Sequence, residues 1–155
     1  MADFEIKQAD SDADIRRCFP VMQVLRPHLT DADDLTARVR RMQAQGHWSL
    51  IYVEDKGEVV ACSGFRLGEW LAYGRALYVD DLVCLESHRG QGFAESLMRW
   101  MEDHARAEGC EVFHLDSGTH RLPAHRFYHR LGMGISSFHF IKKIAPKVMI
   151  HRNRG

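Results

Sequence analysis

The spacing of hydrophobic residues along the chain changes from helical to strand-like at Trp48. Before this residue, apolar side chains recur every three or four positions in two segments, which predicts two amphipathic helices. A proline at position 20 is expected to cause a kink or a late start of the first helix, and Gly46 is expected to end the second. The predicted helices begin at Ser11 or Asp12 and at Thr30 or Asp31.

From Trp48 onward, runs of β-branched and aromatic residues predict strands, interrupted by two further helical patterns. The turn Asp55-Lys56-Gly57 between two such runs indicates a hairpin, and residues 68–74 read as a loop. With a short run at the N-terminus, strands are expected over residues 4–7, 49–54, 58–66, 76–85, 111–116 and 136–144. The later helices are expected over residues 93–108 and 123–131.

The order of these elements predicts an α/β fold with a mixed sheet that carries helices on both faces. The strand, helix and strand between residues 76 and 116 are expected to form a right-handed parallel crossover. With 155 residues, no internal repeat and no linker-like segment, the chain is expected to form a single domain over residues 1–155.

Charge and composition exclude several functional classes. The chain has 21 basic and 21 acidic residues, which argues against nucleic-acid binding through bulk positive charge. No apolar run is long enough to cross a bilayer, so no membrane partner is expected. The N-terminus lacks the features of a signal peptide, and four scattered cysteines fit free thiols, so we expect a cytoplasmic protein.

The most informative stretch is Arg89-Gly90-Gln91-Gly92-Phe93-Ala94, between a predicted strand and a long helix. Small residues at such a turn let the backbone approach a ligand, and the amides at a helix start favour an anion. The stretch is neither a P-loop, because no Gly-Lys-Ser/Thr ends it, nor a complete dinucleotide fingerprint. It therefore predicts a phosphate-binding turn, although such turns are also glycine-rich for steric reasons alone.

Two segments together resemble the GCN5-related N-acetyltransferase (GNAT) superfamily. LVCLESHRGQGFAESLMRWM resembles its acyl-coenzyme-A motif, Arg/Gln-x-x-Gly-x-Gly/Ala, through Arg89, Gly92 and Ala94. PAHRFYHRLGM, from Pro123 to Met133, is similar to the family's short helix that carries a tyrosine before a Leu-Gly pair. The resemblance implies the GNAT fold, with a mixed central sheet of six to seven strands flanked by about four helices.

The resemblance also implies which residues bind acetyl-CoA. The family's strand before the glycine turn splays from its neighbour at a bulge and pairs its backbone with the pantetheine arm, and the turn holds the pyrophosphate. Arg121 replaces a family asparagine, which removes one pantetheine contact, but its side chain could reach a phosphate. The implied cofactor-binding residues are Leu82, Val83, Cys84, Arg89, Gly90, Gln91, Gly92, Phe93, Ala94, Glu95 and Arg121.

Catalysis in the family needs a base for the amine and an acid for the leaving thiolate. The resemblance assigns the acid to Tyr128 and the base to Asp80, four residues before Cys84. Neighbouring residues of a strand point to opposite faces, so only one of Asp80 and Asp81 is expected to face a given cleft. Asp81 would then orient the substrate or the sheet, and Glu86 is a third candidate base.

Two histidines, His125 and His129, have a spacing that can hold a metal, but no third ligand is evident and no metal is expected. The acceptor site would be built from residues 25–34, 68–75 and 116–120, with Trp70 and Tyr73 as candidates for its lining. The charges of these segments are mixed and do not identify the acceptor.

The function that follows from the resemblance is direct acetyl transfer from acetyl-CoA to a primary amine of a small molecule or a protein. The alternative is a non-catalytic acyl-CoA sensor or interaction module with the same fold. Dimers are common in the family, so a homodimer is the protein partner that the resemblance suggests.

Overall fold

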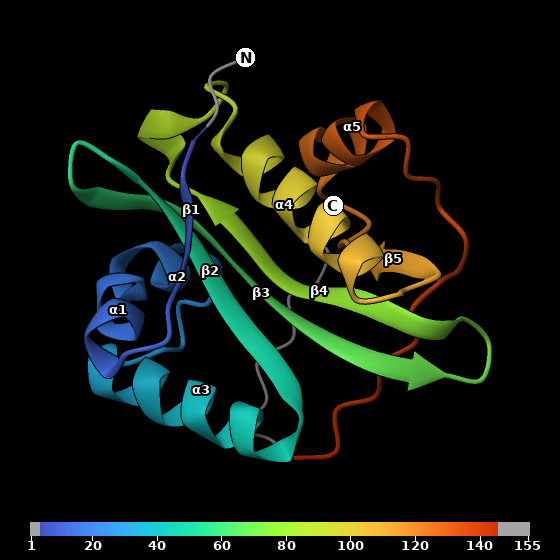
Figure 1. Ribbon diagram of the computed structural model, residues 1–155, viewed down its shortest axis with the longest axis horizontal. Helices are drawn as coiled ribbons and strands as arrows, with labels where there is room; N and C mark the ends of the chain where they lie inside the picture. Colours follow the sequence, from blue (N-terminus) through green and yellow to red (C-terminus); the bar gives the residue numbers. More distant parts are fainter. Residues whose placement is uncertain (1–3, 146–155) are drawn as a thin grey trace. The chain divides into compact units, whose positions relative to one another are not determined.

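The computed structural model describes residues 4–145, which fall into two compact units that divide after Leu115. The first unit contains the sheet and all helices except one (Figure 1). The second unit, from Asp116 onward, contains one helix within the described residues. The single domain over residues 1–155 stays a prediction.

The sheet has five strands in the order β1-β2-β3-β4-β5 (Figure 1). Neighbours from β1 to β4 are antiparallel, and β5 is parallel to β4, with the long helix between them in sequence. The sheet is therefore mixed, as predicted. The strands are β1 (Ile6–Gln8), β2 (His47–Asp55), β3 (Glu58–Trp70), β4 (Gly74–Cys84) and β5 (Val112–Leu115).

The expected six to seven strands are not present in residues 4–145, because residues 136–144 form no strand. Phe138 and Phe140 alternate with polar residues, and both are exposed, by 79% and 92%. A strand needs a neighbour that pairs with its backbone groups, and alternation in the sequence does not supply one. The prediction of a strand here was wrong for that reason.

The helices begin where capping residues allow. Ser11 accepts a hydrogen bond from the amide of Asp14, and Asp31 accepts one from the amide of Asp34. The expected kink near Pro20 is a break, because the chain starts a new helix at Phe19 with the proline in its first turn. The helices are α1 (Asp12–Arg17), α2 (Phe19–Leu25), α3 (Ala32–Gln45), α4 (Phe93–Ala107) and α5 (Leu122–Arg130), with a 3₁₀ turn, η1, at Glu86–His88.

Within the first unit, α1, α2 and α3 cover one face of the sheet and α4 covers the other (Figure 1). Ile15, Val21 and Val39 from the first three helices are buried in one cluster with Leu50 and Cys62 of the sheet. On the opposite face, apolar side chains of α4 are buried, and the ring of Phe65 contacts Trp100. Helices on both faces account for the continuous buried run of residues 59–65 in β3.

The hairpin of β3 and β4 is longer than the sequence suggests. Its ladder runs to the pair Trp70 and Gly74, so only residues 71–73 form the turn. The glycines at positions 68 and 74 favour a loop in sequence terms, but backbone pairing extends through both. The predicted loop over residues 68–74 was therefore wrong for most of its length.

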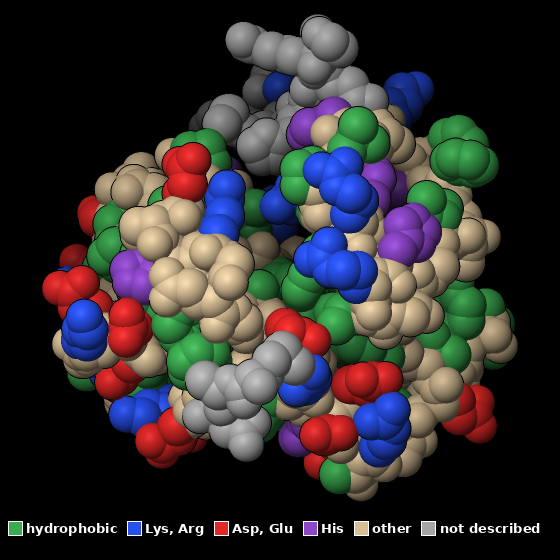
Figure 2. All heavy atoms as spheres, turned by 90° about the horizontal axis from the view of Figure 1, so that it is seen from above, with side chains coloured by type: hydrophobic (Ala, Val, Ile, Leu, Met, Phe, Trp, Pro, Cys, Tyr) green, Lys and Arg blue, Asp and Glu red, His purple; other side chains and the backbone are tan. Residues whose placement is uncertain are grey.

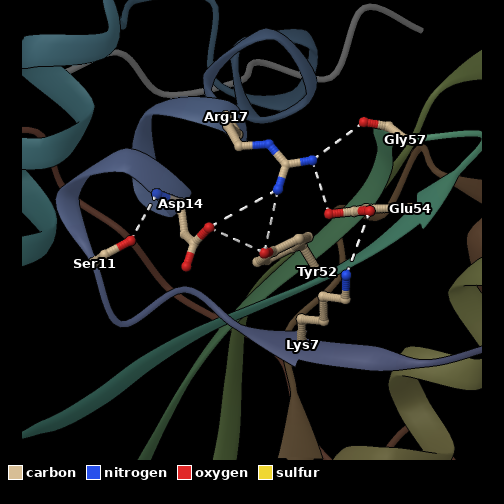
Figure 3. A network of polar contacts seen from close by, with 7 residues as sticks. All are labelled: Lys7, Ser11, Asp14, Arg17, Tyr52, Glu54 and Gly57. Atoms are coloured by element: carbon tan, nitrogen blue, oxygen red, sulfur yellow. Dashed lines mark hydrogen bonds and ion pairs between the residues drawn. The ribbon is translucent and has the colours of Figure 1, made fainter.

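A polar network around Arg17 joins α1 to β2 and to the β2–β3 turn (Figure 3). The Arg17 guanidinium lies 2.7 Å from a carboxylate oxygen of Glu54 and donates to the carbonyl of Gly57. The Tyr52 hydroxyl donates to Asp14 at 3.2 Å. The Arg17 hydrogen bond lowers the pKa of Glu54, while burial, with the nearby charge of Asp14, raises the pKa of Tyr52 to about 12.

The surface carries charges of both signs. On the face drawn in Figure 2, acidic and basic side chains alternate over much of the area, with hydrophobic side chains between them. Among the helices of residues 4–145, none has the length and apolarity needed to span a membrane.

Candidate functional site

Strand β4 changes its partners at Asp80. On one side, Gly64 of β3 pairs with Asp81 while Phe65 pairs with Val79, so Asp80 is an extra residue that forms a β-bulge. On the other side, the parallel ladder with β5 ends at Val79 and Leu115. The two strands therefore part at the residue where β4 bulges, which leaves residues 80–84 without a β5 partner.

The bulge brings both carboxylates to the same face of the sheet. A Cβ atom on Gly64 would lie 2.3 Å from the Trp48 ring and 3.0 Å from Asp81 Oδ2, so the indole and this carboxylate share that face. The same indole donates from Nε1 to Asp80 Oδ2 at 2.7 Å. The expectation that only one of the two acids faces a cleft was therefore wrong, because a bulge breaks the alternation of a strand.

Asp80 is held by two side chains at a single oxygen. Its Oδ2 accepts hydrogen bonds from Nε1 of Trp48 and, at 2.8 Å, from Nε of Arg66, whose Nη2 lies 2.7 Å from the same oxygen as an ion-pair contact. Charge-assisted bonds of this kind are short and strong, and they fix the position of a carboxylate. Asp80 is thus a rigid, charge-compensated group.

Asp81 is bound differently. Its Oδ1 accepts a 2.7 Å bond from Nε of Arg26, which ends α2 and also donates to the backbone carbonyl of Asp80 at 3.0 Å. The hydroxyl of Ser63 donates to the Asp81 carbonyl. Burial raises the pKa of the Asp81 carboxyl despite the opposing charge of Arg26, and the charge of Asp80 adds to the increase. A buried carboxyl with a raised pKa is suited to accept a proton.

A row of side chains crosses this face from β2 to β5. The strand registers place four residues opposite one another in consecutive strands: Trp48, Arg66, Tyr78 and His114. Trp70 and Tyr73, the candidates for the acceptor lining, pack their rings against the His114 imidazole at 5.0 Å between ring centroids. The row and these two rings form an aromatic surface beside the acidic pair.

The glycine turn lies between η1 and α4 in the same unit. Gly90 and Gly92 have φ angles of 76° and 89°, a left-handed conformation that side chains other than glycine rarely adopt. Among residues 4–145, no side chain forms a capping hydrogen bond at the start of α4, which leaves the amides of its first turn without a side-chain cap. Phe93 stacks on Phe4 with ring centroids 4.2 Å apart, which fixes the start of the helix. This arrangement can hold an anionic group.

The other predicted site residues of the first unit lie on β4 and beside the glycine turn. Leu82, Val83 and Cys84 occupy the part of β4 that has left β5, and the Val83 side chain is buried in the core. Arg89 and Glu86 are exposed beside the glycine turn. Burial raises the pKa of the Cys84 thiol, which keeps it protonated and leaves it without a nucleophilic role.

Tyr128 and Arg121 belong to the second unit, where Arg121 precedes α5 and Tyr128 lies on its second turn. Burial raises the pKa of Tyr128, and the charge of Arg121 opposes this increase. His125 bonds to the carbonyl of Gly118 at 2.8 Å, and His129 bonds to that of Met133. Both histidines thus fix the ends of α5, and no group of three or more metal-ligating side chains occurs in residues 4–145.

Sequence reasoning missed Arg66 as a site residue and left the role of Trp48 open. A signal for Arg66 existed, because it is a charged residue directly after the mostly apolar run of residues 59–65, at even spacing from Gly64. Arg26 was noted only as part of an acceptor segment. Its contact with Asp81 depends on how α2 packs on β4, which spacing in the sequence does not reveal.

Comparisons with known proteins extend these observations. The sequence model of the acetyltransferase (GNAT) family matches residues 13–133. An aminoalkylphosphonate N-acetyltransferase from Salmonella typhimurium is 39% identical over 89 residues, which are 57% of this chain and 58% of that protein. A streptothricin acetyltransferase from Streptomyces lavendulae is 31% identical over 70 residues, 45% of this chain and 37% of that protein. These matches thus span less than two thirds of either relative.

A glucosamine-6-phosphate N-acetyltransferase from Arabidopsis thaliana has a similar structure, with a TM-score of 0.75 at 20% identity. The superposition covers 93% of this chain and 100% of that chain. At this identity the likeness concerns the fold alone.

Proposed function

Because the chain belongs to the acetyltransferase (GNAT) family, we propose that it transfers an acetyl group from acetyl-CoA directly to a primary amine. The observation that supports this most is the parting of β4 and β5 at the bulge that turns Asp80 and Asp81 to one face. A backbone edge without a strand partner and a pair of acids then lie side by side. The unpaired backbone edge can bind an extended ligand, and the pair of acids can bind an amine.

The residues around the glycine turn fit the cosubstrate. Its pyrophosphate would meet the amides of residues 90–95, where Gly90 and Gly92 permit close approach and Arg89 adds a positive charge. The pantetheine arm would pair with the backbone of Leu82, Val83 and Cys84. Acetyl-CoA supplies the acyl group as a thioester.

The acidic pair would prepare the amine for attack. An amine is mostly protonated at neutral pH, so it must lose a proton before its nitrogen can form a bond to the thioester carbon. The contacts favour Asp81 over Asp80 as the acceptor of that proton, directly or through water. Both acids pair with an arginine, and at Asp81 burial raises the pKa of the carboxyl despite that pairing. Asp80 would then position Arg66, and exposed Glu86 is less suited to the role of base.

Tyr128 would provide the proton for the departing thiolate when the carbon–sulfur bond breaks. Burial raises the pKa of its phenol, so the hydroxyl stays protonated at neutral pH and can donate. This role carries over from the family motif, residue by residue. The variant Tyr128→Phe tests it, and a kcat within about twofold of wild type would contradict it.

We place the acceptor among small molecules rather than proteins. The relatives from Salmonella typhimurium and Streptomyces lavendulae are both named for small-molecule acceptors. The homodimer suggested by the resemblance stays a prediction.

The experiment that tests the proposal measures thiol release from acetyl-CoA by the purified chain across a panel of small amines. We expect release that depends on the amine, together with the acetylated product. Calorimetric binding of CoA without release for any amine would instead favour the non-catalytic sensor. Absence of CoA binding would contradict both functions.

A further inference from the structure

We propose that the acceptor carries an acidic group close to its amine and that Arg66 binds this group. The inference rests on the proposed acetyl transfer and concerns the same site. Arg66 would then determine substrate specificity. The proposed substrate class is a zwitterionic amine and not a polyamine.

The charges of the site are balanced. Asp80 and Asp81 are each paired with an arginine, Arg66 and Arg26 respectively. A polyamine has only positive charges, so it would meet two guanidinium groups that repel it as strongly as the carboxylates attract it. An acceptor with one positive and one negative group matches a site that contains both.

Both arginines use Nε and Nη2 in these contacts, and they differ in the exposure of their side chains. Arg26 uses Nε on the Asp81 carboxylate and Nη2 on a backbone carbonyl, and its side chain is 35% exposed. Arg66 directs Nε and Nη2 at the single oxygen Oδ2 of Asp80, and its side chain is 46% exposed. Within the described residues, Nη1 of Arg66 makes no hydrogen bond. This edge of the guanidinium can take a carboxylate or phosphonate oxygen.

The position of Arg66 on β3 sets the size of the acceptor. Gly64, the partner of Asp81 in the ladder, lies two residues before Arg66 on the same face. Two residues along a strand span about 6.6 Å between their Cα atoms, so we expect the linker between the amine at Asp81 and the acid at Arg66 to be short. Trp48 and Tyr78, the neighbours of Arg66 in the row, bound this space with aromatic surface.

The test compares amines that differ only in the acid. The panel contains 2-aminoethylphosphonate and β-alanine, propylamine as the analogue without the acid, and spermidine. For each amine, kcat/KM for thiol release is measured with the wild-type chain and with Arg66→Gln. Arg66→Lys, which keeps a positive charge, should recover part of the loss. The control is Arg40→Gln, because Arg40 is 42% exposed on α3 and directs Nε and Nη2 at a single oxygen of Asp12 instead.

We expect the wild-type chain to prefer an acid-bearing amine over propylamine by about 10- to 100-fold, the effect of one charge-assisted bond, and Arg66→Gln to abolish that preference. The informative quantity is the ratio of kcat/KM between the acid-bearing amine and propylamine. Loss of the Asp80 contact alone would lower kcat/KM for all amines equally and leave this ratio unchanged. An equal loss for every amine, or a wild-type preference for spermidine or propylamine, would overturn the inference. Calorimetry with CoA present measures the same preference in binding, so amines that bind but are never acetylated would contradict the proposed function separately.

Discussion

Two arginine–carboxylate pairs hold the N-terminal helices against the sheet, and they affect their carboxylates in opposite directions. Arg17 and Glu54 lie 2.7 Å apart at the outer end of β2, and Arg26 and Asp81 lie 2.7 Å apart in the central strand β4. The pKa of Glu54 is lowered, whereas that of Asp81 is raised. Equal geometry therefore does not give equal chemistry.

The difference comes from what surrounds each pair. At Glu54 the hydrogen bond from Arg17 outweighs the effect of burial, so the charged form is favoured. At Asp81 burial outweighs Arg26, and the neighbouring charge of Asp80 adds to it. A partly solvated ion pair stabilises the fold, whereas a desolvated carboxylate next to a second acid is a group that can exchange a proton.

The largest contrast is expected in activity. Asp81→Asn removes the proposed proton acceptor with little change in shape, and kcat/KM for acetyl transfer should fall by about 10²- to 10⁴-fold. Glu54→Gln, the matched change in the other pair, should leave kcat/KM within about twofold. Steady-state thiol release measures both variants. Equal activity of wild type and Asp81→Asn would remove Asp81 from the mechanism.

The next effect concerns the packing that supports the acidic pair. In Gly64→Ala the new Cβ would meet the Trp48 ring at 2.3 Å, so the indole must move away from Asp80. We expect unfolding free energy to fall by about 1–3 kcal/mol, with a loss of activity. Gly46→Ala is the control, because no atom lies within 4 Å of its Cβ position. Chemical denaturation distinguishes them, and equal stability would contradict the proposed contact.

Much of this region can be predicted from the sequence, and there are physical reasons why the remaining features cannot. The crossover from β4 through α4 to β5, the helix caps and the left-handed glycines follow from periodicity and local chemistry. The family resemblance implies a bulge in this strand, but the position of the bulge at Asp80 does not follow, because it depends on the register between β3 and β4, and registers are set by long-range packing. The contacts of Arg26 and Arg66 depend on that bulge, so they could not be predicted either.

A smaller effect is expected at the Arg17 network (Figure 3). Arg17→Gln removes the ion pair with Glu54 and weakens the link between α1 and β2. Because the pair is partly exposed, the loss of unfolding free energy should be about 0.2–1 kcal/mol, with no change in kcat/KM. Thermal unfolding and thiol release are measured together. A selective loss of activity would show that this network belongs to the site.

The dependence of stability on pH should have opposite signs for the two carboxylates. The folded pKa of Glu54 is lowered, so its stabilisation is present above the unfolded pKa and is lost as pH falls through the folded value. The folded pKa of Asp81 is raised, so its contribution declines as pH rises from the unfolded value through the folded one. Across the acidic range, the stability difference between wild type and variant should therefore increase with pH for Glu54→Gln and decrease for Asp81→Asn. Denaturation at a series of pH values measures both differences. If the two differences change with pH in the same direction, the proposed contrast between Glu54 and Asp81 is contradicted.

The most direct test of the central claim, that Asp81 accepts the proton of the amine, is the pH profile of kcat/KM. In the wild-type chain, activity should rise with pH as Asp81 ionises, at a pKa above that of an ordinary aspartate. In Asp81→Asn this acidic limb should disappear while residual activity remains, and Glu54→Gln should keep it unchanged. An acidic limb that persists at the same pH in Asp81→Asn would contradict the claim.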